Sequence, residues 1–428
     1  MSYLGLDIGT TSICVVVTDG AGELFFCESA QNESGAAVQN PERIWDICTN
    51  LLERAFAACP DIAGIGVCGQ MHGVLYLDAG GRPVSPLYTW QDESGNEIMP
   101  GGGTYAEALT DLTGHAMASG FGCTTLFLRA RKGIVPTGAA QICTIHDYVA
   151  MRLCGLARPV MHASDAASFG LFDLKKLQFD MEAIRAAGLP EDLFPGVTAD
   201  FDVLGTHKNI PVTLAVGDNQ ASFLGAAEEP GRTVLVNVGT GSQCSLTSAY
   251  VPPERLPSGA ELRPLCGEQY LYVGSALCGG RAFALAKDFF VRCAQFFGME
   301  LSDGAVYAAM DNLLKENPPP LESRLRVDTQ FAGTRRNPGL RGSVTGIGTD
   351  NFTPAHLLWG LVEGMAEELC GFYRDSGKTR SLLVGAGNGL RKNAALRQAL
   401  ESRFGMPLAV PSYGEEAARG AARIAAGL

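Results

Sequence analysis

The chain has 428 residues, with 33 Lys and Arg against 45 Asp and Glu, and its formal net charge is −12. Hydrophobic residues make up 46% and charged residues 18%, which supports a buried core and excludes a disordered chain. The acidic balance disfavours nucleic acid and anionic membranes as main partners, because both select clusters of Lys and Arg. At roughly 100–200 residues per domain, this length predicts two domains.

The 13 cysteines form no CxxC pair and no zinc-type spacing, and several stand inside apolar runs. We interpret them as reduced, buried thiols and expect a cytoplasmic protein. The first residues lack the basic and apolar regions of a secretion signal. No stretch reaches the roughly 18 apolar residues of a membrane-spanning helix.

The predicted elements begin with two buried strands, 3–8 and 13–17, joined by the polar turn Gly9-Thr10-Thr11-Ser12. A helix is expected from Pro41, because Asn40 is a suitable N-cap and Pro suits the first helical position. The later predicted elements are strands at 62–67, 213–216 and 381–384, a long helix that begins at Thr353-Pro354 and a helix that ends at Gly405.

An internal repeat is the most informative feature of the sequence. Residues 4–12 can be laid on residues 234–242, so that Gly, Thr and Ser coincide and Asp7 meets Asn237. Because the offset is about half the chain, it predicts two similar α/β domains, 1–228 and 229–428. Chance similarity in a chain with 53 glycines is the alternative.

The first copy of the repeat ends in Asp-x-Gly-Thr-Thr, a pattern suited to phosphate. Gly9 lets the backbone approach a ligand, and the amides and hydroxyls of Thr10 and Thr11 can donate hydrogen bonds to phosphate oxygens. Asp7 can hold a hydrated Mg²⁺. An ordinary hairpin whose threonines satisfy local backbone is the alternative, but the second copy favours a phosphate clamp.

Asp218 follows a predicted buried strand and is flanked by Gly217 and Asn219. A carboxylate at the carboxyl end of a strand in an open α/β sheet faces the usual ligand crevice and can take a proton from an attacking hydroxyl. A turn aspartate that caps the next helix is an equally good interpretation.

Two glycine-containing loops of the first half combine an imidazole, a carboxylate and an aromatic ring. These loops are Met71-His72 and Trp90-Gln91-Asp92. These groups suit a polyhydroxy ligand, which offers hydroxyls to bond and C–H faces to stack. A surface loop with a half-buried Trp is the alternative.

Residues 64–69 fit the GxGxxG pattern of dinucleotide binding, but we discount the match. The pattern needs a preceding strand and a following helix, whereas these glycines alternate with apolar residues inside one predicted strand. No P-loop occurs in the sequence. The run Gly385-Ala386-Gly387-Asn388-Gly389, which precedes a predicted helix, suits a nucleoside that rests on bare backbone.

Taken together, these motifs resemble the FGGY family of carbohydrate kinases, within the superfamily that includes actin. The first Gly-Thr turn is similar to the family's first phosphate motif, and Gly-Gln-Met-His-Gly (69–73) to its ketose-contact loop. Gly217-Asp218-Asn219-Gln220 is similar to the loop that holds the catalytic aspartate. The order and spacing of the matches run through the whole chain.

The resemblance implies two ribonuclease H-like, actin-type α/β domains with an interdomain cleft, the sugar on the first domain and ATP on the second. Asp218 would be the base and a sugar contact, Asp7 would hold Mg²⁺, and Thr10, Thr11 and Ser12 would bind phosphate. The other implied sugar contacts are Met71, His72, Trp90, Asp92 and Asn219. The implied nucleotide contacts in the second half are Gly239, Thr240, Gly279, Gly280, Gly385, Ala386, Gly387 and Asn393.

The implied reaction is ATP-dependent phosphorylation of a ketose at a terminal primary hydroxyl. The loops at 216–222 and 385–393 are most similar to those of sedoheptulokinases, so sedoheptulose is the expected sugar. A xylulokinase or another sugar or polyol kinase is the alternative, and a non-catalytic nucleotide switch of the same superfamily is a weaker one. A homodimer is a further possibility that the sequence leaves open.

Two departures from the family pattern stand out. Many relatives carry Lys or Arg where Cys14 stands, so one positive charge near the phosphates is missing or comes from elsewhere. The chain is also short for the family, which puts sugar specificity and oligomer contacts in doubt more than the chemistry.

Overall fold

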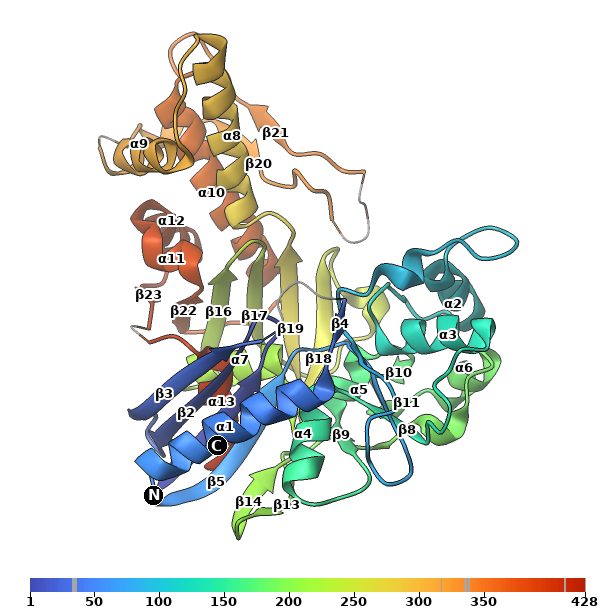
Figure 1. Ribbon diagram of the computed structural model, residues 1–428. Helices are drawn as coiled ribbons and strands as arrows, with labels where there is room; N and C mark the ends of the chain where they lie inside the picture. Colours follow the sequence, from blue (N-terminus) through green and yellow to red (C-terminus); the bar gives the residue numbers. More distant parts are fainter. Residues whose placement is uncertain (33–36, 317, 335–336, 338, 412, 428) are drawn as a thin grey trace. The chain divides into compact units, whose positions relative to one another are not determined.

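The computed structural model describes residues 1–32, 37–316, 318–334, 337, 339–411 and 413–427. The chain forms two compact units, each built around its own sheet (Figure 1). The first unit comprises Met1–Ala226, Arg263–Tyr270 and Tyr413–Leu428, and the second comprises Ala227–Leu262 and Leu271–Ser412. The expected two-domain α/β architecture is confirmed, and residues 413–427 pack with the first unit rather than with the sequence that precedes them.

The sheet of the first unit combines an antiparallel meander with parallel strands, in the order β13-β14-β5-β1-β2-β3, with β15 also paired to β5. The predicted strand 213–216 is wrong as a single element, because β14 ends at Thr213 and a short β15 begins at Val216. The bounds are β1 Ser2–Ile8, β2 Ser12–Asp19, β3 Leu24–Gln31, β5 Ile62–Gly69, β13 Val203–His207, β14 Ile210–Thr213 and β15 Val216–Gly217.

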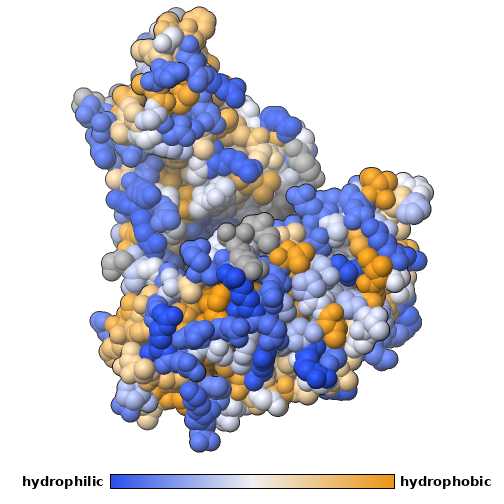
Figure 2. Space-filling view, in the orientation of Figure 1, coloured by the Kyte–Doolittle hydropathy of each residue, from blue (hydrophilic) through white to orange (hydrophobic). Residues whose placement is uncertain are grey.

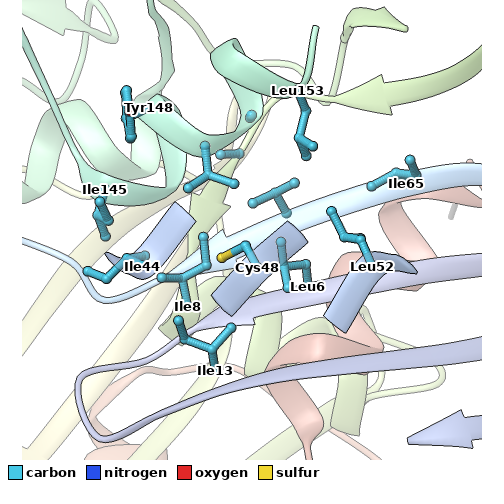
Figure 3. Close-up of a cluster of buried hydrophobic side chains, with 14 of the residues drawn as sticks. Leu6, Ile8, Ile13, Ile44, Cys48, Leu52, Ile65, Ile145, Tyr148 and Leu153 are labelled. Atoms are coloured by element: carbon cyan, nitrogen blue, oxygen red, sulfur yellow. The ribbon is translucent and has the colours of Figure 1, made fainter. Parts of the chain in front are cut away.

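Helix α1 (Pro41–Ala58) covers one face of this sheet, as the sequence predicted. The Asn40 side chain caps it by accepting hydrogen bonds from the backbone of Glu42 and Arg43 at 3.0 and 3.3 Å. Apolar residues at helical spacing on α1 pack on the alternate, inward-facing residues of β1, a contact that Figure 3 shows at Ile44, Cys48 and Leu52. Burial of these side chains stabilises the layer by about 1.5–3 kcal/mol for each large residue.

The opposite face of β1 and β5 is flattened by glycines and covered by the C-terminal helix α13 (Glu416–Ala425). A Cβ atom on Gly5 would lie 1.8 Å from the Ala418 carbonyl oxygen, and one on Gly66 would lie 1.9 Å from that of Ala421. The glycines of 64–69 therefore serve close helix packing, consistent with discounting a dinucleotide motif.

Four helices of the first unit contribute to a second hydrophobic cluster beside the sheet, namely α2 Tyr105–Thr113, α3 Gly122–Lys132, α5 Ala163–Ser168 and α6 Met181–Ala186. Helix α4 (Ile145–Leu153) belongs to the core on the sheet itself, and α7 (Asp218–Ala226) packs against α13. Short two-stranded ribbons pair β4 (Val38–Gln39) with β7 (Leu87–Tyr88), β6 (Leu75–Leu77) with β8 (Gln141–Cys143), β9 (Val160–His162) with β12 (Gly196–Thr198), and β10 (Phe172–Asp173) with β11 (Gln178–Phe179).

The sheet of the second unit repeats the central topology of the first. Strand β16 pairs antiparallel with β17 and parallel with β22, as β1 pairs with β2 and β5. The second turn is one residue shorter, because Val238 pairs with Ser242 whereas Ile8 pairs with Ile13. The order is β18-β19-β17-β16-β22-β23, with β16 Thr233–Val238, β17 Ser242–Ser248, β18 Ala260–Cys266, β19 Gln269–Ala276, β22 Leu382–Ala386 and β23 Leu408–Ala409.

Helices complete the second unit, and two of them confirm sequence predictions. Helix α10 (Pro354–Asp375) has Thr353 as its N-cap, and α12 (Ala394–Phe404) ends at Gly405 with φ +66°. The others are α8 Gly280–Phe296, α9 Asp303–Lys315 and α11 Asn388–Lys392, with a ribbon of β20 Arg326–Asp328 and β21 Ser343–Thr345. No helix in the described part of the chain is long and apolar enough to cross a membrane.

Candidate active site

Three parallel strands of the first unit end at the same edge of the sheet and place Asp7 and Asp218 there. Asp7 near the end of β1 pairs with Cys68 on β5, and Cys68 pairs in turn with Val216 on β15. Asp218 follows β15 directly and is the first residue of α7. Because the carboxyl ends of parallel strands form the usual ligand crevice, these two carboxylates lie at the edge where such a sheet typically binds its ligand.

The electrostatic surroundings of both carboxylates disfavour their charged forms. Burial, then repulsion from Asp218, raises the pKa of Asp7 to about 7, although the Cys68 thiol donates to Asp7 Oδ1 at 3.6 Å. Burial also raises the pKa of Asp218, which positive charge at His146 and Arg263 opposes. A carboxylate that is poorly hydrated and close to a like charge is a candidate for proton transfer or cation binding.

A buried polar cluster that the sequence did not reveal lies on neighbouring helix N-termini. His146 Nε2 on α4 lies 3.0 Å from Asp165 Oδ1 on α5, and both side chains are fully buried. Burial raises the pKa of Asp165 and lowers that of His146 because each charged form loses hydration. Ser164 links this cluster to the residue before Asp218, since its hydroxyl donates to Asp165 Oδ1 at 3.3 Å and accepts from Gly217 N at 3.1 Å.

The predicted sugar loop packs beside Asp218. A Cβ atom on Gly217 would lie 2.8 Å from the Met71 sulfur, so Met71 lies against the residue that precedes Asp218. His72 has φ +72°, donates from Nδ1 to the Ser168 carbonyl oxygen at 2.7 Å and stacks on Phe121 with ring centroids 4.7 Å apart. These contacts fix the orientation of the imidazole.

Trp90 and Asp92 take different positions. Trp90 is 48% exposed, and its Nε1 donates to the Thr10 hydroxyl at 2.9 Å, which joins a predicted sugar residue to the predicted phosphate turn. Asp92 is buried, and its carboxylate accepts hydrogen bonds from Ser94 and Thr125 as the cap of a short 3₁₀ helix. A sugar hydroxyl at Asp92 would have to share these carboxylate oxygens.

Thr10, Thr11 and Ser12 form the turn between β1 and the start of β2. The Thr10 hydroxyl donates to Gln70 Oε1 at 3.0 Å, whereas Thr11 is exposed. A further side-chain contact stabilises the turn, because the Asn32 side chain donates to the Gly9 carbonyl oxygen at 2.9 Å. The hydroxyl proton of Thr10 is therefore engaged within the protein.

The predicted nucleotide residues of the second unit converge on the turn between β16 and β17. Gly279 N and Gly280 N, at the start of α8, donate to the carbonyl oxygens of Thr240 and Gly239 at 3.0 and 2.7 Å. A Cβ atom on Gly279 would lie 2.4 Å from the Gly241 carbonyl oxygen. Backbone thus packs on backbone, and this close approach requires glycine at position 279.

The third predicted nucleotide segment joins the same edge of this sheet. Gly385 and Ala386 lie on β22 opposite Val236 and Asn237, and Gly387 has φ +88° and packs on the end of β16. Asn393 has a structural contact as well, since its side chain accepts from Leu396 N at 2.9 Å and caps α12.

The residues near Asp7 fit a water-rich Mg²⁺ site rather than a protein cage. Among the described residues, no three His, Cys, Asp or Glu side chains gather to hold a metal. Mg²⁺ is typically bound by one or two carboxylates together with waters and substrate phosphates. A cation would also relieve the repulsion between Asp7 and Asp218.

Cys14, where the family resemblance led us to expect Lys or Arg, does not supply a positive charge. It pairs with Asp7 across the β1–β2 ladder, and its buried side chain packs with Ala418 and Ala422 of α13. Burial raises the pKa of its thiol, and the nearby Glu415 carboxylate raises it further. Cys14 is therefore a neutral packing residue.

Family models and solved structures agree with this architecture. The models of the N- and C-terminal domains of the FGGY family of carbohydrate kinases match residues 2–225 and 235–427. The chain belongs to this family and is a carbohydrate kinase. The structure of xylulose kinase from Rhodospirillum rubrum covers 100% of this chain and 89% of its own, with a TM-score of 0.82 and 22% identity.

The names of the curated relatives refer to different substrates. Human sedoheptulokinase is 30% identical over 477 residues, which cover 98% of this chain and 96% of the relative. Xylulose kinase from Streptomyces coelicolor is 26% identical and covers 99% of this chain and 87% of its own. The family is therefore shown, whereas these relatives do not agree on one sugar.

Proposed function

We propose that this kinase transfers the γ-phosphoryl group of ATP to the terminal primary hydroxyl of a ketose, and that the sugar is sedoheptulose. The observation that carries the proposal is the convergence of Asp7, Asp218 and the Met71-His72 loop at one edge of the first sheet. Similarity to human sedoheptulokinase supports the seven-carbon sugar. Xylulose is the second candidate because xylulose kinases are also similar.

In this mechanism Asp218 accepts the proton of the attacking hydroxyl, and burial assists by raising its pKa toward that of a useful base. Asn219, Met71, His72, Trp90 and Asp92 would contact the sugar. Mg²⁺ bound through water at Asp7 would neutralise charge on the transferred phosphate. The protein otherwise acts by positioning the reactants, since phosphoryl transfer needs little covalent chemistry from side chains.

The nucleotide would bind on backbone groups rather than on cationic side chains. Thr10, Thr11 and Ser12 of the first unit and Thr240 of the second would offer main-chain amides to phosphate oxygens. The Gly239 amide already donates to the Gly241 carbonyl oxygen at 2.9 Å, so Gly239 would contribute the close approach of its backbone. The segments at 279–280 and 385–387 carry little or no side chain, so the nucleoside would pack against their main chain. Asn393 is the remaining expected contact at the adenosine end.

A panel of sugars tests the named substrate. Release of ADP is measured with sedoheptulose, D-xylulose and glycerol at saturating Mg-ATP. Sedoheptulose should have the highest kcat/KM, and glycerol a much lower one, because a site built to bond hydroxyls rejects analogues that lack them. If xylulose is the better substrate by tenfold or more, the kinase assignment stands and the named sugar is wrong.

A cytoplasmic location and a homodimer remain predictions. All 13 cysteines are free thiols, which is consistent with a reducing compartment. Helix α8 exposes Phe289 and Phe296, and Figure 2 shows apolar side chains on the part of the second unit that carries α8 and α9. Analytical ultracentrifugation of the purified chain distinguishes a dimer from a monomer.

A further inference from the structure

Four side chains of the first unit form a continuous hydrogen-bonded network around the phosphate turn. Trp90 Nε1 donates to Thr10 Oγ1 at 2.9 Å, and Thr10 Oγ1 donates to Gln70 Oε1 at 3.0 Å. Gln70 Nε2 donates to Gln39 Oε1 at 2.9 Å, and Gln39 Nε2 donates to the Thr10 carbonyl oxygen at 3.0 Å. We call these four residues the Thr10 network; it closes a ring through both the side chain and the backbone of Thr10.

The direction of every bond in the Thr10 network is determined by its two ends. The Thr10 carbonyl oxygen only accepts, so the Gln39 amide nitrogen must face it and the Gln39 oxygen must face Gln70. The Gln70 oxygen then faces the Thr10 hydroxyl, which must donate. The Trp90 indole only donates, so the same hydroxyl accepts from it. No alternative amide orientation satisfies all four contacts.

The position of the Thr10 network links two parts of the proposed site. Gln70 directly precedes Met71 and His72, and Trp90 is itself an expected sugar contact. Gln39 lies on β4, which pairs with β7 shortly before Trp90. Gln39 and Gln70 are 1% and 3% exposed, so their hydrogen bonds form out of water, where such bonds are strong and their loss is costly.

We infer that Gln39 and Gln70 are positioning residues for phosphoryl transfer, which act by holding the phosphate turn at Thr10 in register with the sugar loop. Sugar packed on Trp90 and the Met71-His72 loop would stiffen the same network that orients the Thr10 amide. Sugar binding is therefore coupled to nucleotide binding, and the coupling passes through these amides. The inference rests on the proposed function for the location of the sugar.

The test compares Gln39→Leu with Gln141→Leu as a matched control. Gln141 is also a buried glutamine of the first unit, and its amide donates to the Ala157 carbonyl oxygen at 3.3 Å, outside the site. We expect Gln39→Leu to lower kcat by roughly 10–100-fold, the scale of a misplaced reactant. Gln141→Leu should change the melting temperature to a similar extent with kcat unchanged.

Three further measurements separate positioning from a general loss of structure. Thr10→Ser keeps the hydroxyl and should stay within about threefold of the wild-type kcat, whereas Thr10→Val should match Gln39→Leu. The double variant Thr10→Val/Gln39→Leu should be no worse than either single variant, because residues of one network are not additive. In the wild type, saturating sugar should lower the KM for ATP at least fivefold, the lower end of typical coupling, and Gln39→Leu should abolish this effect.

The inference is overturned if Gln39→Leu leaves kcat unchanged, or if sugar does not alter the KM for ATP in the wild type. It is also overturned if the fold-decrease in kcat of the double variant equals the product of the decreases in Gln39→Leu and Thr10→Val. These measurements use whichever of sedoheptulose and D-xylulose the wild-type enzyme phosphorylates faster. Failure of the proposed sugar therefore appears in the wild-type panel, whereas failure of the inference appears only in the wild-type coupling and in the variants.

Discussion

His146 Nε2 and Asp165 Oδ1 lie 3.0 Å apart in a fully buried pair between α4 and α5. The interaction with Asp218 is mutual, since positive charge on His146 would lower the pKa of Asp218 and the Asp218 carboxylate raises that of His146. Burial acts in the opposite direction on both groups and is the larger effect. The proposed base therefore belongs to a set of buried titratable groups rather than acting as an isolated carboxylate.

The Asp218→Asn variant tests the base directly. The amide keeps the size of the side chain and most of its hydrogen bonds but cannot accept the proton. We expect kcat to fall by roughly 10²–10⁴, the range for loss of a general base, with little change in the KM for ATP. Steady-state ADP release measures both, and the exposed Asp192→Asn on the same unit is the control. Retention of more than a tenth of the activity would show that another group takes the proton.

Gly279→Ala tests the backbone contact on the second unit. The added Cβ atom would lie 2.4 Å from the Gly241 carbonyl oxygen, so the start of α8 would have to move away from the Gly239-Thr240 turn. We expect the KM for ATP to rise at least tenfold and the KM for sugar to change little. Gly304→Ala on α9 is a matched control, because a Cβ atom there meets nothing within 4 Å. Equal kinetics for both variants would remove this turn from the nucleotide site.

The pH dependence of stability should reveal the buried carboxyl group of Asp147. Burial, followed by repulsion from Asp165, raises the pKa of Asp147 to about 8 from 3.8. Because its folded pKa lies above its unfolded value, the group stabilises the fold fully below about pH 4, and this contribution is lost as the pH rises toward 8. Thermal unfolding between pH 5 and 8.5 should therefore show a falling melting temperature.

Asp147→Asn should make that fall shallower, because the amide cannot ionise yet retains an acceptor for the Thr144 hydroxyl, which donates to Asp147 Oδ2 at 2.6 Å. The exposed Asp46→Asn on α1 is the control and should keep the wild-type slope. Parallel curves for wild type and Asp147→Asn would contradict a protonated Asp147 in the folded state.

Much of the local structure could be predicted from the sequence because its causes are local. Asn40 and Pro41 determine the start of α1 through hydrogen bonds and dihedral angles within one turn, and Gly405 ends α12 through its own positive φ. The repeat of residues 4–12 at 234–242 likewise predicted two similar domains, and the structure gives β1 and β16 matching pairings. Even so, the single strand expected at 213–216 divides, because β14 and β15 pair with different stretches of β5.

The sequence by itself thus determined the family, the repeated hairpins and the motif residues Asp7 and Asp218. Only the tertiary structure decided their partners, because a hydrogen bond or a desolvated charge depends on atoms that are distant along the chain. Thr10 illustrates this point, since its motif suggested a hydroxyl donor to phosphate, whereas Gln70, sixty residues away, receives that proton. His146 and Asp165 are likewise brought together by the packing of helices, which no local sequence pattern encodes.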